Sequence, residues 1–249
     1  MKILFLGTAG YHPNEQRQTT SIFLPELGLA LDAGTGFFRI REFLETNTLD
    51  ILLSHAHLDH TIGLTFLYGI THQKEVAQIR TYAPAQKLDA IQQHLFHPDL
   101  FPLPPNFECV PLADSGVNQL CHAQVSSVSI PHPGGAVAYR IESDLEPKTL
   151  AYVTDTTATS SAAYVDLIRN VDVLIHECNF RDGQEDLAEL TGHSSLTPVL
   201  QLARAANVGQ LVLTHINCYE TSVDPLGQET IDQVFPNTII ATDGLEISV

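Results

Sequence analysis

The stretch His55-Ala56-His57-Leu58-Asp59-His60 decides how the rest of the sequence is interpreted. It follows the apolar run 51–53, so His55 and His57 face the same side of an extended segment, in which side chains alternate. Asp59 and His60 come where the chain turns into a helix, so their side chains can diverge from the first two and bind a separate ion. Three imidazoles and a carboxylate within six residues are hard to bury without a cation. An exposed histidine-rich turn is the alternative, but the pattern favours a metal site at a strand end.

Three more residues of ligand type stand in similar positions. Each directly follows an apolar run: His132 after 128–131, Asp155 after 150–154 and His215 after 211–214. Any one of them alone is most simply a turn residue. Together they indicate a larger site, because strand ends at one edge of a sheet converge in space.

Strand and helix patterns alternate along the chain. Helical periodicity covers 84–96 and 195–206, and Gly209 ends the second of these helices. Strands outnumber helices and are predicted at 3–6, 21–24, 29–31, 51–53, 125–130, 136–141, 150–153, 171–175, 211–213 and 238–241. This order predicts an α/β fold in which two sheets pack face to face with helices outside.

Composition indicates a globular protein with a sizeable core. The chain has 249 residues and a net charge of −17, which repels phosphate backbones in general, although metal ions can invert the field inside a cleft. Its four cysteines form no CxxC pair, and no apolar run is long enough for a signal peptide or a membrane span. We therefore expect one domain over 1–249, located in the cytoplasm, with no membrane partner.

The ordered ligand set resembles the metallo-β-lactamase superfamily. The likeness rests on the HxHxDH segment and the three later ligands, and it extends from Gly7-Thr8-Ala9-Gly10 to the C-terminal strands. It implies a four-layer αββα sandwich and two divalent metal ions, usually zinc, with manganese or iron as alternatives. It also implies a division of ligands: His55, His57 and His132 on one ion, Asp59, His60 and His215 on the other, and Asp155 between them.

The chemistry of such a centre follows from the two charges. Two adjacent cations lower the pKa of a water held between them and neutralise charge that develops on a phosphoryl or carbonyl oxygen. Asp59 is placed to accept the proton of that water as well. Asp32 has two interpretations, a buried carboxylate that orients the histidine loop or a plain turn residue.

A second pair of motifs narrows the resemblance to one branch. His176-Glu177-Cys178-Asn179-Phe180, followed by Gly192-His193-Ser194-Ser195, is similar to ribonuclease Z and its phosphodiesterase relatives. The resemblance implies that Glu177 orients His193, which contacts the scissile phosphate and protonates the leaving oxygen. With Asp59, these are the predicted catalytic residues. The simpler interpretation of His193 is a neighbour of the helix cap at Ser195.

The likeness to ribonuclease Z is incomplete. Those enzymes carry a long basic arm that grips tRNA, commonly between the third histidine motif and the bridging aspartate. Here the corresponding interval, 133–154, holds only Arg140 and Lys148 as basic residues and has no room for an arm. Together with the negative net charge, this argues against tRNA and favours a small-molecule or nucleotide phosphodiester as substrate.

Several alternatives stay open. Asp155 stands where a cysteine is expected in an antibiotic-degrading lactamase, which argues against that activity. A hydrolase of carboxylic esters or thioesters, a homodimer that processes tRNA 3′ ends with basic surface from its partner, and an inactive metal-binding scaffold are the other candidates. The favoured prediction is a cytoplasmic dinuclear zinc phosphodiesterase that resembles ribonuclease Z without the arm.

Overall fold

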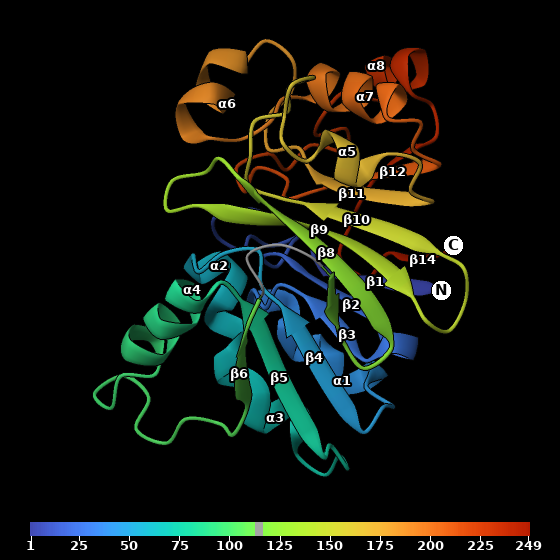
Figure 1. The fold of residues 1–249 in the computed structure, drawn as a ribbon. Helices are drawn as coiled ribbons and strands as arrows, with labels where there is room; N and C mark the ends of the chain where they lie inside the picture. The colour runs from blue at the N-terminus through green and yellow to red at the C-terminus, as the bar shows by residue number, and fades with distance from the viewer. Residues whose placement is uncertain (113–116) are drawn as a thin grey trace.

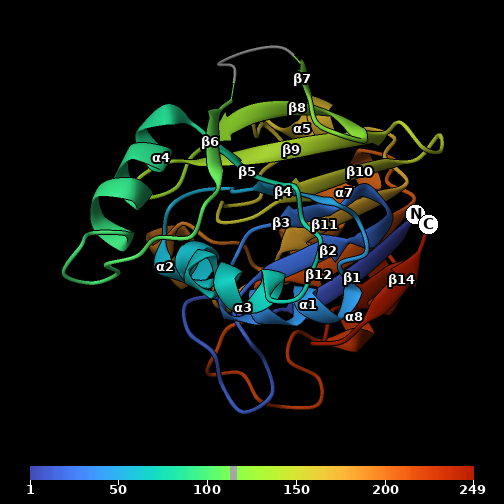
Figure 2. The ribbon, with the colours of Figure 1, turned by 90° about the horizontal axis from the view of Figure 1, so that it is seen from below.

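The computed structural model describes residues 1–112 and 117–249, which are arranged in four layers (Figure 1). Two seven-stranded sheets pack face to face, and helices cover their outer faces. The αββα sandwich predicted from the sequence is thereby confirmed. The two termini lie side by side (Figure 2), where the Val249 N–H donates a hydrogen bond to the carbonyl of Met1.

The first sheet comes from the N-terminal part of the chain and the last strand. Its strands lie in the order β14 (Glu246–Ser248), β1 (Lys2–Gly7), β2 (Ser21–Leu24), β3 (Leu29–Leu31), β4 (Thr48–Leu52), β5 (Gln78–Ala83) and β6 (Glu108–Pro111). The strand predicted at 51–53 begins earlier, at Thr48. Asp50 hides its start in the sequence, because a charged residue breaks the apolar pattern. Arg80 on β5 pairs with this carboxylate at 2.7 and 2.9 Å.

The second sheet carries most of the strand ends that the sequence singles out. Its order is β13 (Thr238–Ile240), β12 (Gln210–Thr214), β11 (Val173–Glu177), β10 (Thr149–Val153), β9 (Ala136–Ser143), β8 (Ala123–Ile130) and β7 (Val117–Gln119). Strands β10, β11 and β12 are parallel, and β8 runs in their direction because β8 and β10 are both antiparallel to β9. Four carboxyl ends therefore lie at one edge of this sheet.

Helices form the outer layers, one set on each sheet. The first sheet is covered by α1 (Ile40–Phe43), α2 (Leu58–Thr61), α3 (Leu67–Thr71) and α4 (Ala85–Ala90), and the second by α5 (Val165–Ile168), α6 (Glu185–Thr191), α7 (Leu196–Ala205) and α8 (Gln228–Val234) (Figure 1). Helix α4 continues as a π-helical turn at Ile91–Leu95, so the predicted helix 84–96 is nearly continuous. No helix in the described ranges is both long and apolar enough to cross a membrane.

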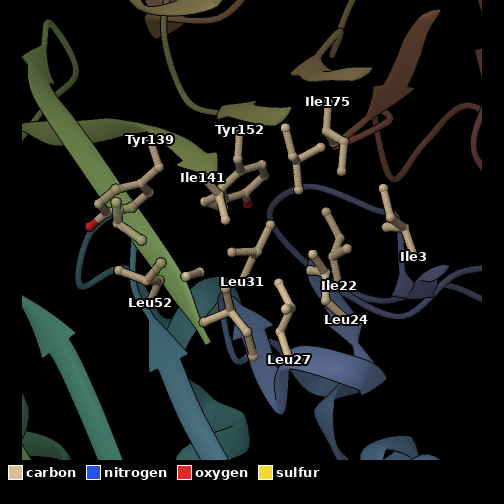
Figure 3. Close-up of a cluster of buried hydrophobic side chains, with 14 of the residues drawn as sticks. Ile3, Ile22, Leu24, Leu27, Leu31, Leu52, Tyr139, Ile141, Tyr152 and Ile175 are labelled. Atoms are coloured by element: carbon tan, nitrogen blue, oxygen red, sulfur yellow. The ribbon is translucent and has the colours of Figure 1, made fainter. Parts of the chain in front are cut away.

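The central strands of each sheet are buried on both faces. In β11, Val173 and Ile175 point into the core between the sheets, whereas Leu174 packs under the outer helices. This alternation is the period of two expected for a strand. Figure 3 shows the inner core, where Ile175 and Tyr152 of one sheet face residues such as Leu31 of the other.

Candidate metal centre

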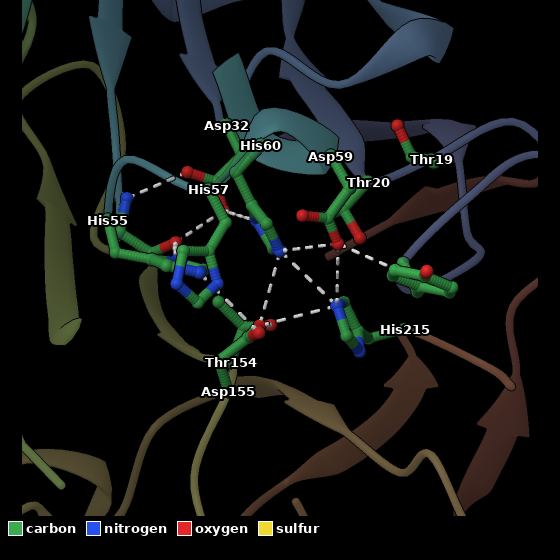
Figure 4. A network of polar contacts seen from close by, with 12 residues as sticks. Thr19, Thr20, Asp32, His55, His57, Asp59, His60, Thr154, Asp155 and His215 are labelled. Atoms are coloured by element: carbon green, nitrogen blue, oxygen red, sulfur yellow. Dashed lines mark hydrogen bonds and ion pairs between the residues drawn. The ribbon is translucent and has the colours of Figure 1, made fainter. Parts of the chain in front are cut away.

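The predicted ligands come together where the carboxyl ends of the two sheets meet (Figure 4). The chain leaves several strands there through sharp turns. Asp32, Asp155 and His215 have positive φ angles of 56°, 56° and 55°, a conformation that side chains other than glycine rarely adopt. Each costs about 1 kcal/mol or more, and such strain is concentrated at functional sites. The turns bring polar side chains across the edge of the sandwich.

One group of donors gathers around a single carboxylate oxygen of Asp155. Its Oδ2 lies 3.6 Å from Nε2 of His55 and 3.4 Å from Nε2 of His132. His57 belongs to the same group, and the donor atoms of all four residues lie within 4.8 Å of one another. The four side chains come from the ends of β4, β8 and β10, so both sheets contribute.

The other carboxylate oxygen of Asp155 faces a second group. Its Oδ1 lies 3.3 Å from Nε2 of His60 and 3.4 Å from Nε2 of His215. Oδ2 of Asp59 lies 3.3 and 3.5 Å from the same two nitrogens. The structure thus brings all seven predicted ligands together in two groups, with one oxygen of Asp155 turned toward each.

The donor spacing fits divalent metal ions. Four donors around a tetrahedral ion with bonds of about 2.0–2.1 Å are about 3.3–3.4 Å apart, and the distances around Asp155 are 3.3–3.6 Å. Nε2 of His55 is buried and has no hydrogen-bond partner, although such a group normally has one. A cation between these donors accounts for both observations.

In four of the five ligand histidines the outer nitrogen has a polar partner, which leaves Nε2 turned inward. Nδ1 of His55 lies 3.0 Å from the Ser54 hydroxyl, and Nδ1 of His60 lies 2.7 Å from Asp32. Nδ1 of His132 lies 3.3 Å from the Gly192 carbonyl, and Nδ1 of His215 lies 3.3 Å from the Asn179 amide. Such outer contacts fix the ring orientation of metal-binding histidines.

Asp32 is the centre of these outer contacts. It is fully buried and accepts hydrogen bonds from the Ser54 N–H and hydroxyl, both at 2.7 Å, and from the Tyr152 hydroxyl at 2.6 Å. Its Oδ2 also lies 2.7 Å from Nδ1 of His60. Of the two interpretations of Asp32, the orienting carboxylate is confirmed. Tyr152 was not predicted, because it has the pattern of an ordinary core residue of β10.

The electrostatics keep His55 and Asp155 in the forms that bind metals. His60, by contrast, must lose a proton when an ion binds, because its burial is outweighed by the carboxylates of Asp155, Asp59 and Asp32, which raise its pKa. Burial, helped by repulsion from His60, lowers the pKa of His55 to about 2, so its imidazole is neutral. Burial would raise the pKa of Asp155, but the charges of His215 and His60 outweigh it and hold the pKa well below the usual value. Neutral imidazoles and ionised carboxylates are the ligand forms that divalent ions require.

Glu177 and His193 form a pair beside the ligand groups. Glu177, the last residue of β11, is fully buried, and its Oε1 lies 3.0 Å from Nδ1 of His193. Burial would lower the pKa of His193, but the charge of Glu177 and this hydrogen bond raise it to about 9. The His193 ring stacks on His215 at 5.2 Å and lies 5.4 Å from His132. The two residues thus lie side by side as their motifs predict, and their catalytic role stays a prediction.

Two other neighbours of the centre gave no signal in the sequence. The side-chain amide of Asn179 donates to the carbonyl of His215 at 3.0 Å, and the Tyr11 N–H donates to Oδ2 of Asp59 at 2.8 Å. Both lie in loops and act through local contacts that no spacing rule predicts. Beside His132 and Gly192 lies a cavity of about 800 Å³, lined largely by threonine hydroxyls and apolar groups.

Comparison with known families agrees with this geometry. The family described as the beta-lactamase superfamily domain matches residues 29–216, which is most of the chain. This chain belongs to that superfamily. It is accordingly a metal-dependent hydrolase, and the cluster of histidines and aspartates is a site for divalent metal.

Individual relatives of this superfamily member cover the full chain. A ribonuclease Z from Archaeoglobus fulgidus is 28% identical over all of this chain and 97% of its own length. The metallo-beta-lactamase fold protein YhfI from Bacillus subtilis superposes with a TM-score of 0.83 at 21% identity over 99% of both chains. The short form of human tRNase Z gives 0.76 at 22% identity, over 100% of this chain and 99% of its own. The two structures share the fold.

Proposed function

We propose that this protein is a dinuclear zinc phosphodiesterase, similar to ribonuclease Z but acting on small-molecule or nucleotide phosphodiesters. The observation that supports it most is the position of Asp155, one oxygen of which faces His55 and His132 while the other faces His60 and His215. Two groups that share one carboxylate suit two ions, with His57 completing the first group and Asp59 the second.

The side chains of this site divide the work of phosphodiester cleavage. When bound, two zinc ions would lower the pKa of a water between them and neutralise charge on the phosphoryl oxygens. Asp59 accepts the proton of the attacking water, since its Oδ2 lies among the donors of the second group. His193 protonates the leaving oxygen through Nε2, because its Nδ1 is committed to Glu177.

Three features favour small substrates over tRNA. The residues between His132 and Asp155 form one turn, β9, a second turn and β10, so this interval contains no projecting arm. The alignment with the archaeal ribonuclease Z spans 306 positions, more than the 249 residues of this chain, so the relative carries insertions that are missing here. A net charge of −17 also repels the phosphate backbone of a long nucleic acid.

The direct test is hydrolysis of bis(p-nitrophenyl) phosphate by protein loaded with Zn²⁺ or Mn²⁺. We expect turnover by the wild type, a loss of about a hundredfold or more in Asp59→Ala, and no loss in Asp99→Ala, which changes an exposed aspartate in a loop. Faster turnover of p-nitrophenyl acetate than of the phosphodiester would instead indicate an esterase. Absence of phosphodiester turnover, or turnover unaffected by Asp59→Ala, contradicts the proposal.

A second assay separates the small-substrate proposal from tRNA processing. A homodimer that supplies basic surface would cleave a precursor tRNA at its 3′ end, and we expect no such cleavage at physiological salt.

Elemental analysis completes the test. The proposal requires two metal ions per chain, and fewer would favour a binding scaffold.

A further inference from the structure

Two loops at the rim of the metal centre are locked together. One follows β1 and the other follows β12. The Ile216 N–H donates to the Thr8 carbonyl at 2.8 Å, and the Gly10 N–H donates to the Ile216 carbonyl at 3.0 Å. A Cβ atom at Gly10 would come within 2.3 Å of the His215 ring, so this loop lies directly against a predicted ligand. The rim on this side is a fixed surface.

The locked loops carry three aromatic rings. His12 lies between two tyrosines, with its ring centroid 5.1 Å from that of Tyr11 and 5.4 Å from that of Tyr219. Cys218 also holds the imidazole in place, because its Sγ lies 3.3 Å from Nε2 of the ring. Tyr11 and Tyr219 are nevertheless 72% and 76% exposed. Rings held in place with their faces exposed are available for stacking against another planar group.

Tyr11 also bears backbone strain. Its φ is +67°, which is uncommon for a bulky residue, and its N–H donates to Oδ2 of Asp59 at 2.8 Å. The hydrogen bond needs only the backbone and would be kept by glycine, which adopts this conformation freely. The tyrosine side chain therefore has no role in holding Asp59, and its exposed ring requires a separate explanation.

A hollow continues from this aromatic surface. Tyr219 lines a cavity of about 240 Å³ together with Asn179, Asn217, Arg181 and Glu220, the last two of which form an ion pair at 3.7 Å. Asn179 contacts His215, so the cavity adjoins the metal centre. Amide and guanidinium groups beside an aromatic ring suit a planar, polar heterocycle, which can stack on the ring and form hydrogen bonds at its edge.

We infer that Tyr11, His12 and Tyr219 form a nucleobase subsite next to the scissile phosphate. The inference rests on the proposed phosphodiesterase function and deepens it, since it makes the substrate a nucleotide rather than a lipid or sugar phosphodiester. Stacking on tyrosine tolerates every base, because each base has a π-face. The subsite selects nucleotides as a class and discriminates weakly among the bases.

Binding of two reaction-product analogues to the metal-loaded protein tests the subsite without requiring turnover. Adenosine 5′-monophosphate and ribose 5-phosphate share the phosphate and the sugar, and only the first has a base. By isothermal titration calorimetry we expect adenosine 5′-monophosphate to bind about fivefold to a hundredfold more tightly than ribose 5-phosphate, because this is the contribution of one stacked base to affinity. Tyr11→Gly and Tyr219→Ala should each shrink this ratio, and the double variant should bring it close to one.

Matched variants separate the rings from the fold. Tyr11→Gly removes the ring and relieves the backbone strain, and Tyr219→Phe keeps a stacking face. Tyr68→Ala removes another tyrosine, 54% exposed, on the distant helix α3. We expect Tyr219→Phe and Tyr68→Ala to retain the wild-type ratio. Equal affinity for the two ligands in the wild type, binding of neither at millimolar concentration, or an unchanged ratio in the double variant overturns the subsite.

The outcome for the subsite is distinguishable from that for the proposed function. Turnover of bis(p-nitrophenyl) phosphate without any preference for the nucleotide overturns the subsite and leaves the phosphodiesterase intact. A preference for the nucleotide that depends on Tyr11 and Tyr219, without phosphodiester turnover, supports the subsite and contradicts the proposed reaction.

Discussion

The imidazole of His193 is held by the buried carboxylate of Glu177, whose Oε1 lies 3.0 Å from Nδ1 of the ring. The same carboxylate accepts the backbone N–H groups of Thr156 at 2.8 Å and of Ser194 at 3.1 Å. Three contacts from two segments fix the carboxylate, and through it the ring has one orientation beside the metal centre.

Glu177→Gln should therefore impair the reaction more than the fold. The amide must turn its NH₂ group toward either a backbone N–H or His193, so the orientation of the ring is lost. We expect kcat on a phosphodiester to fall by about a hundredfold, while KM changes by no more than about threefold.

The control for Glu177 is another change from carboxylate to amide, Asp182→Asn. Asp182 accepts the N–H and the hydroxyl of Thr197, near the start of α7, at 2.8 and 2.7 Å. This variant should lose about 1 kcal/mol of stability and keep its kcat. An equal fall of kcat in both variants would show that Glu177 acts only through stability.

Tyr152→Phe should weaken metal binding from within the core. The hydroxyl donates to Asp32 at 2.6 Å, and Asp32 in turn contacts His60. Loss of this contact is expected to cost about 1–3 kcal/mol in the free energy of unfolding and about tenfold or more in zinc affinity.

The control for Tyr152 is the other inner-core tyrosine. The hydroxyl of Tyr139 donates to the Leu53 carbonyl at 2.6 Å, and it is buried as completely as that of Tyr152. Tyr139→Phe should lower stability similarly but leave zinc affinity within about twofold of the wild type. Denaturant titration and competition with a zinc chelator measure the two quantities, and equal zinc affinities of the two variants would refute the role of Tyr152.

Removal of metal should lower the thermal stability of the protein. An ion that binds only the folded state adds about 4 kcal/mol when its concentration is a thousand times its Kd. Differential scanning calorimetry before and after chelation measures this difference, and added Zn²⁺ should restore it. His55→Ala should abolish the response, whereas His97→Ala, in an exposed loop, should keep it. An unfolding midpoint that chelation leaves unchanged contradicts a metal centre.

Acid should destabilise the protein partly through Asp172. Slight burial would raise the pKa of this carboxyl, but the N–H and hydroxyl of Thr149, with Lys148, hold it below its usual value. Its contribution to stability is therefore present above the unfolded-state pKa and is lost as pH falls through the folded-state pKa. Asp172→Asn should be less stable than the wild type at pH 6, with the difference shrinking below about pH 4. A difference independent of pH, by urea unfolding, would exclude this linkage.

Much of this architecture could be predicted because its signals are local. Strands β2 and β3 lie where their apolar runs predict them, and α2 begins at Leu58, inside the histidine segment. Strands β5, β6 and β14 escaped prediction, since polar residues such as Gln78, Glu108 and Glu246 break their apolar pattern. Pairing with neighbours in the sheet, rather than composition, makes these segments strands.

The site shows the same division between local and distant information. Residues of ligand type after strands are visible in the sequence, and so is the motif around His193. The roles of Tyr152 and Asn179 depend on which strand ends meet, and His12 is held by Cys218 and Tyr219, which are distant from it in the sequence. Such contacts are made by the fold and leave no trace in spacing.

The seven ligands come from both sheets, and this bears on the order of folding and metal binding. His55 and His215 lie in different sheets, with most of the chain between them, and their donors approach only after the sandwich has closed. Contacts of such long sequence separation form late in folding. We therefore expect metal to stabilise the closed sandwich rather than to nucleate its folding. We expect chains synthesised in metal-poor cells to fold first and to acquire their ions as finished molecules.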